Sequence, residues 1–240
     1  MQFILDWVAQ RLKTGGHMEV VKKPPASGSG TVRIWTDAKA TEQAAWVGGW
    51  LEECEDSMKC RWFSLQVTEV SAPWLLYRGK NPKRVIAALE LLATLIALKL
   101  WLKKAGDTAE VRAEAFTDNK GNSFILQKGL STKYPITILV IEVAETLRRC
   151  DAFATLTWVR RDDNTLADAL TNEDFSSFDP QRREAVTEEV LKWHVMDDLL
   201  QSSEKLFNEI KDHKMKKNKE KPKLDHTKRK AKKYFSRWKS

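Results

Sequence analysis

At 240 residues with 42% hydrophobic content, the chain can form one core of ordinary size with appendages, and it is short for two full domains. No apolar run reaches the roughly 18 uninterrupted residues of a membrane span, because the longest candidate carries Glu90 and Lys99. The N-terminus lacks a basic leader with a small-residue cleavage site, and the three cysteines lack zinc-ligand spacing. We therefore expect an intracellular protein with free thiols, in the nucleus or cytoplasm.

The positive charge is concentrated at the C-terminal end. The whole chain has a net charge of +8, whereas residues 211–240 hold 14 Lys and Arg against three acids, a net charge of +11. Residues 1–210 therefore carry a net charge of about −3. The basic tail also contains Tyr234, Phe235 and Trp238. Such a tail is typically disordered or a solvated helix, and it often holds nucleic acid or directs nuclear import.

The N-terminal half begins with a short helix and continues as strands. Residues 1–23 are predicted to form an amphipathic helix, and the Pro/Gly/Ser-rich residues 24–30 a linker. Apolar residues then alternate or cluster in three strands, predicted over 31–38, 44–51 and 60–70.

A long helix separates these strands from the second half. Pro82 opens it, because proline suits the first helical turn, and we expect it to be mostly buried and to run to about Lys104. A strand, two helices, a strand and a short helix follow, predicted over 110–117, 119–130, 135–149, 154–161 and 164–171. Residues 179–210 are predicted to form a long amphipathic C-terminal helix that leads into the basic tail.

This order of elements predicts an α/β fold. Three antiparallel strands followed by alternating helices and strands imply a mixed five-stranded sheet with helices on both faces. The domain is expected to span residues 31–178, with the predicted helices flanking it.

Four acidic residues fall at notable positions of these elements. Asp37 lies inside the first strand, Asp118 ends the fourth, and Asp168 lies in the short helix. Glu90 is surrounded by Leu, Ala and Ile, where a carboxylate is costly unless it is paired or binds a metal. Each acid except Asp37 also has an ordinary explanation, as a helix cap, a turn residue or a solvated side chain. Asp is a poor strand former, so Asp37 is harder to explain in that way.

The segments around these acids resemble one family. Residues 31–172 resemble the ribonuclease H family, particularly the domains attached to retroelement and pararetrovirus reverse transcriptases. The resemblance rests on the order Asp, Glu, Asp, Asp and on four segments: "TDA", "ALELLA", "FTDNKGN" and "WVRRDDNTLADALT". The last segment is the most specific.

The resemblance implies a metal-dependent nuclease. Two Mg²⁺ ions roughly 4 Å apart, for which Mn²⁺ can substitute, would promote hydrolysis of the RNA strand of RNA–DNA hybrids and leave 5′-phosphates. Asp37 would bridge both ions, Glu90 and Asp118 would hold one, and Asp168 the other. We expect a monomer that does not associate with a membrane. Nucleic-acid contacts are predicted at Ala38, Lys39, Asn119, Lys120, Asn122, Arg160, Arg161 and Asn164.

The chain departs from the family pattern in three places. The segment "RRDDN" before the last short helix has no histidine, the basic handle of some relatives is missing, and Asn119 and Lys120 replace a small polar residue and Gln. The N-terminal flank is typical of a fragment of a reverse-transcriptase polyprotein without polymerase activity. Proofreading exonucleases are excluded because Lys39 stands where they need Glu, and transposases because their acids follow another order. A junction resolvase lacks motif support, and a catalytically idle fold that binds nucleic acid or a partner stays open.

Overall fold

The computed structural model describes residues 31–68, 71–72, 81–102, 111–129, 131 and 133–195, together with Ala9 and Lys13, both helical. The rest of the predicted N-terminal helix, the linker, the basic tail and the second half of the predicted C-terminal helix lie outside these residues. Within the described ranges no helix is long and apolar enough to cross a membrane.

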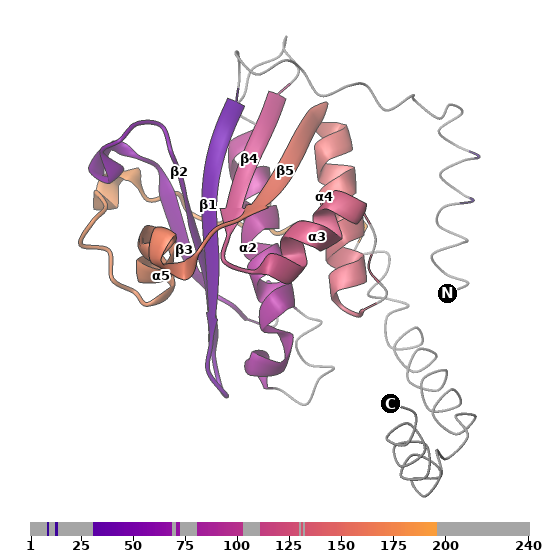
Figure 1. The fold of residues 1–240 in the computed structure, drawn as a ribbon, viewed down its shortest axis with the longest axis horizontal. Helices are drawn as coiled ribbons and strands as arrows, with labels where there is room; N and C mark the ends of the chain where they lie inside the picture. Colours follow the sequence, from indigo (N-terminus) through magenta and orange to yellow (C-terminus); the bar gives the residue numbers. More distant parts are fainter. Residues whose placement is uncertain are drawn as a thin grey trace, which may run out of the picture. The chain divides into compact units, whose positions relative to one another are not determined.

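One five-stranded sheet forms the centre of the described structure (Figure 1), with the strand order β3-β2-β1-β4-β5. The first three strands pair antiparallel, while β4 runs parallel to β1 and β5 parallel to β4. The predicted mixed sheet is therefore confirmed. Its strands are β1 (Thr31–Ala40), β2 (Ala45–Leu51), β3 (Trp62–Gln66), β4 (Val111–Thr117) and β5 (Ala152–Trp158).

The helices cover both faces of this sheet (Figure 1). Helix α2 packs against β1 and β2 and contacts α4, while α5 packs against the same two strands from the other side. Neighbouring β1 residues mark the two faces: Thr36 contacts Thr94 of α2, and Asp37 contacts Thr171 of α5. The helices are α2 (Ile86–Trp101), α3 (Lys120–Lys128), α4 (Ile136–Arg149) and α5 (Thr165–Thr171), and single 3₁₀ turns lie at η1 (Ser57–Lys59), η3 (Pro82–Val85), η5 (Arg161–Asp163) and η6 (Pro180–Arg182).

Helix α2 is buried almost all round, as the sequence predicts. The Asn81 side chain accepts a hydrogen bond from the Lys83 N–H, and Pro82 starts η3, from which α2 continues. From Ala88 onward every residue of α2 is buried, including Glu90 and Lys99. A helix that is apolar all round is covered on all sides, which explains why this one lies between the sheet and its neighbours.

The predicted C-terminal helix is wrong over its described part. Residues 180–182 form only η6, and residues 183–195 contain no α-helix. Arg183 instead forms a parallel bridge with Trp62 of β3, and the Glu184 N–H donates to the Trp62 carbonyl at 2.7 Å. The Arg183 guanidinium also donates to the Ser64 carbonyl at 3.0 Å. The segment thus satisfies edge groups of β3, and this pairing overrides the helical pattern.

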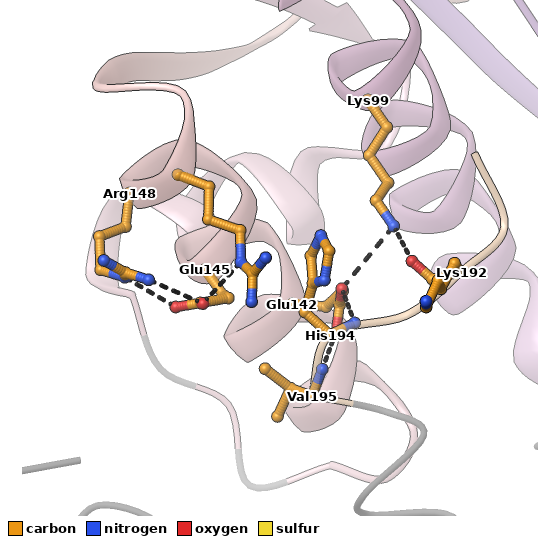
Figure 2. Close-up of polar contacts among 8 residues, drawn as sticks. Lys99, Glu142, Glu145, Arg148, Lys192, His194 and Val195 are labelled. Atoms are coloured by element: carbon orange, nitrogen blue, oxygen red, sulfur yellow. Dashed lines mark hydrogen bonds and ion pairs between the residues drawn. The ribbon is translucent and has the colours of Figure 1, made fainter. Parts of the chain in front are cut away.

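The end of the same segment is anchored to α2 and α4 (Figure 2). The buried Glu142 carboxylate of α4 accepts from the backbone N–H groups of His194 and Val195, both at 2.7 Å. The buried Lys99 ammonium of α2 lies 3.8 Å from the same carboxylate and donates to the Lys192 carbonyl at 2.6 Å. We call Lys99 and Glu142 with residues 192–195 the C-terminal clasp.

A hydrophobic cluster, which we call the Trp62 cluster, fixes α5 on the opposite face of the sheet. It consists of Trp50, Cys60, Trp62, Ala167, Leu170 and Phe178. Gly48 lets the helix approach closely, because a Cβ atom there would lie 3.0 Å from the Leu170 Cβ. Cys60 is a free thiol, as are Cys54 and Cys150, in agreement with the expectation from the sequence.

Candidate active site

Four acids from different parts of the chain line one pocket. The parallel register pairs Trp35 of β1 with Phe116 of β4, so two residues further along Asp37 comes level with Asp118. Glu90 enters from α2 and Asp168 from α5. The pocket has a volume of about 290 Å³ and is lined by Asp37, Ala38, Lys39, Ala40, Ile86, Glu90, Asp118, Arg161, Asp168 and Asn172.

Asp37 is buried beside other acids. It is 5% exposed, and its Oδ2 accepts a hydrogen bond from the Thr171 hydroxyl at 3.0 Å. Burial, with the charges of Asp118 and Asp168, raises the pKa of Asp37 to about 7, although the Thr171 hydrogen bond acts in the opposite direction. The surroundings of Asp37 therefore disfavour its ionised form.

Glu90 is in a similar position. It is 8% exposed, so the alternative that it lies on a solvated stripe of the helix is wrong. Burial, together with the charges of Asp118 and Asp37, raises the pKa of Glu90 to about 8. The Thr117 hydroxyl donates to its Oε2 at 3.3 Å and favours the charged form. The negative charges of Asp118 and Asp37 thus destabilise the ionised form of Glu90.

The sequence leaves two roles open for Asp118, as a helix cap or as a site residue, and the segment after β4 distinguishes them. The Asn119 side chain caps α3 by accepting from the Asn122 N–H at 3.1 Å, so capping does not require Asp118. The Trp158 indole N–H donates to the Asp118 carbonyl at 3.0 Å and holds its backbone. The half-buried Asp118 side chain lines the pocket.

Both carboxylate oxygens of Asp168 have hydrogen-bond donors. Its Oδ1 accepts from the Arg161 guanidinium at 2.8 Å, and its Oδ2 accepts from the Asn172 amide at 2.8 Å. The Lys39 ammonium in turn donates to the Asn172 amide oxygen at 2.7 Å. A cationic side chain, Arg161, is therefore bound to Asp168, the acid that α5 supplies.

The donor chemistry of the pocket suits a divalent cation. Carboxylate oxygens are the ligands that Mg²⁺ prefers, and a cation would favour the ionised forms of Asp37 and Glu90, whose pKa values are raised by burial and by neighbouring negative charges. Among the described residues, however, no three His, Cys, Asp or Glu side chains already form a metal-ligand set. The acids fit a metal by chemistry and location, without a closed coordination geometry.

Of the predicted nucleic-acid contacts, two are corrected. Asn122 and Asn164 are 1% and 2% exposed, and their amides donate to the carbonyls of Ala87 and Thr36. They join the elements that carry the acids, and neither presents its amide to a ligand. Among the others, Ala38, Lys39 and Arg161 line the pocket, Lys120 and Arg160 are exposed, and Asn119 caps α3.

Three residues around the acids were not predicted from the sequence. Thr171 and Asn172 follow Asp168 by three and four positions, which is the spacing of neighbours on a helical surface and was a usable signal. Thr117 precedes Asp118 and reaches Glu90, and nothing in the sequence indicates this contact.

The sheet order, the strand directions and the helices on both faces define the ribonuclease H-like fold, and this chain has that fold. Its sequence matches no family model and no curated protein.

Solved ribonuclease H structures are similar to the chain at low identity. LC11-RNase H1, isolated from compost and solved with an RNA/DNA hybrid, has 16% identity and a TM-score of 0.46, covering 60% of this chain and 96% of its own. RNase H1 of Halobacterium salinarum has 22% identity and a TM-score of 0.42, covering 61% and 98%. An N-terminal RNase H domain from Mycobacterium tuberculosis has 19% identity and a TM-score of 0.42, covering 62% and 96%. The fold assignment rests on the chain's own sheet topology.

Proposed function

We propose that this protein is a divalent-cation-dependent endonuclease that hydrolyses the RNA strand of RNA–DNA hybrids and leaves 5′-phosphates. The observation that carries the proposal is the pocket shared by Asp37, Glu90, Asp118 and Asp168 on a ribonuclease H-like sheet. Buried acids with raised pKa values in one cleft are typical of functional sites.

The four acids would hold Mg²⁺, as two ions, or Mn²⁺ in its place. Bound there, the cations would activate water and stabilise the charge on the leaving oxygen. The Thr171 and Thr117 hydroxyls orient the Asp37 and Glu90 carboxylates.

The cations on the pocket's rim suit a polyanionic substrate. Lys39 and Arg161 line the pocket beside the acids, and the exposed Lys120 lies 5.6 Å from the centre of the exposed Trp158 ring. Lysine and arginine bind phosphates, and an exposed indole offers a surface for a base or sugar. We assign these residues to substrate binding.

We further propose that the domain derives from a retroelement reverse transcriptase. The support is the segment from Trp158 to Thr171, whose residues follow the pattern of that branch, with Arg161, Asp162 and Asp163 where many relatives have a histidine-bearing loop.

A second function, nucleic-acid binding without catalysis, has one specific observation in its favour. Both oxygens of Asp168 are already bonded by Arg161 and Asn172, an arrangement that would be stable without a metal. A binding module would retain the basic rim and would not require metal ions.

A cleavage assay separates these functions. Wild type, Asp118→Asn and the control Asp162→Asn, which changes an exposed acid on η5, are incubated with Mg²⁺ and an RNA–DNA hybrid, single-stranded RNA or duplex DNA. We expect wild type and Asp162→Asn to cut only the hybrid, and Asp118→Asn to lose activity by about 100-fold or more. Equal cleavage by wild type and Asp118→Asn would exclude this site, and binding without cleavage by any variant would support the second function.

A further inference from the structure

The hydrogen bonds around Asp168 form a short chain across the mouth of the pocket. Arg161 and Asn172 each donate to one oxygen of Asp168, and Lys39 donates to the far side of Asn172. Lys39 therefore supports Asn172 without touching the acid, and Arg161 is the cationic side chain whose contact with Asp168 is direct.

The position of Arg161 allows its ion pair with Asp168 to dissociate. Its side chain is 75% exposed and that of Asp168 is 32% exposed, so water competes for their ion pair. Arg161 begins the single turn η5 between β5 and α5, while Asp168 lies on α5, which the Trp62 cluster fixes. Exposed ion pairs contribute little to stability, so releasing Arg161 costs the fold little.

We propose that Arg161 is a positioning residue that neutralises Asp168 in the free protein and transfers to a phosphate of the bound hybrid, thereby making Asp168 available to the metal. This inference rests on the proposed function. A guanidinium and a divalent cation repel each other and compete for the same oxygen, so both cannot hold Asp168 fully. A phosphate matches the guanidinium fork at least as well as a carboxylate does, and can take its two N–H groups together.

The consequence is a coupling between substrate and metal. When phosphate draws Arg161 away, Asp168 gains affinity for the cation, and by reciprocity the cation favours release of Arg161 toward phosphate. Full metal binding would then occur mainly with substrate in place.

The test measures Mn²⁺ affinity by the electron paramagnetic resonance of free Mn²⁺, so it does not depend on turnover. Wild type, Arg161→Ala, Arg161→Lys and Arg160→Ala are titrated alone and with a hybrid whose RNA strand is 2′-O-methylated and resists hydrolysis. Arg160→Ala is the matched control, because it removes the same charge from the adjacent exposed residue. Circular dichroism checks that each variant is folded.

We expect Arg161→Ala to bind Mn²⁺ about 5-fold or more tightly without nucleic acid, a typical coupling between two sites, and Arg160→Ala to change this affinity far less. Arg161→Lys should restore part of the wild-type value. The hybrid should raise Mn²⁺ affinity more in wild type than in Arg161→Ala. Equal Mn²⁺ affinities for Arg161→Ala and wild type, in a wild type that cleaves hybrid, would overturn this inference alone. A wild type that neither binds Mn²⁺ nor cleaves would overturn the proposed function and this inference with it.

Discussion

Replacing Glu142 by Gln tests the C-terminal clasp. The change keeps the size of the side chain and removes its charge, so the buried Lys99 ammonium loses the carboxylate 3.8 Å away. One of the two oxygens becomes an NH₂ group, which cannot accept from the backbone N–H of His194 or Val195. Breaking a buried pair typically costs about 3–5 kcal/mol. A lost hydrogen bond to a charged group accounts for roughly 1.5–3 kcal/mol of that.

The loss of these interactions can destabilise the whole fold, or it can release residues 192–195 while the rest stays folded. Urea denaturation measures the first, and amide hydrogen exchange at His194 and Val195 measures the second. We expect either a loss of about 3 kcal/mol in unfolding free energy or about 100-fold faster exchange at these amides. Glu114→Gln is the control, because its pair with Arg112 is partly exposed and should contribute less than about 1 kcal/mol. A Glu142→Gln protein with unchanged stability and exchange would refute the anchoring role of the clasp.

Three further predictions concern the pocket and the tail. The raised pKa values of Asp37 and Glu90 mean that the metal-free folded state binds protons more tightly than the unfolded chain, so its stability should fall as pH rises from about 4 to 8. In EDTA, Glu90→Gln should reduce this loss of stability by about 1.4 kcal/mol for each unit of pKa shift removed. If urea denaturation gave the same change in unfolding free energy between pH 5 and pH 8 for wild type and variant, the prediction would be contradicted. Gly48→Ala, whose new Cβ would lie 3.0 Å from the Leu170 Cβ, should cost about 1–3 kcal/mol and displace Asp168, lowering hybrid cleavage more than hybrid binding; unchanged cleavage would contradict this. Deleting residues 211–240 should weaken hybrid binding and reduce its salt dependence while turnover at saturating substrate is retained; unchanged affinity and salt slope would favour nuclear import as the tail's role.

The core of the fold could be predicted because its local patterns agree with its packing. The alternating residues of β4 and the apolar length of α2 each match the environment in which they lie. The acids could be assigned because their order and neighbouring residues resemble a family. The first prediction depends on information that is local in the sequence, and the second also depends on the order of the acids from Asp37 to Asp168.

The errors of prediction arise where contacts with residues distant in the sequence determine the local structure. Residues 183–195 have a helical pattern, but the edge of β3 and the carboxylate of Glu142 take their backbone groups. Asn122 and Asn164 follow the pocket residues Asp118 and Arg161 by four and three positions, yet their side chains are buried against other elements. The bond between Arg161 and Asp168 likewise depends on how η5 meets α5, which no spacing in the sequence specifies.

The chemistry of the cut RNA tests the central claim most directly. Hydrolysis by water in the acidic pocket predicts fragments with a 5′-phosphate and a 3′-hydroxyl, formed from a hybrid by wild type with Mg²⁺ and not by Asp118→Asn. Labelling of the 5′ ends before and after phosphatase treatment identifies these groups. Fragments with a 5′-hydroxyl and a 2′,3′-cyclic phosphate would contradict the account, because they result from attack by the RNA's own 2′-hydroxyl and require no acidic metal site.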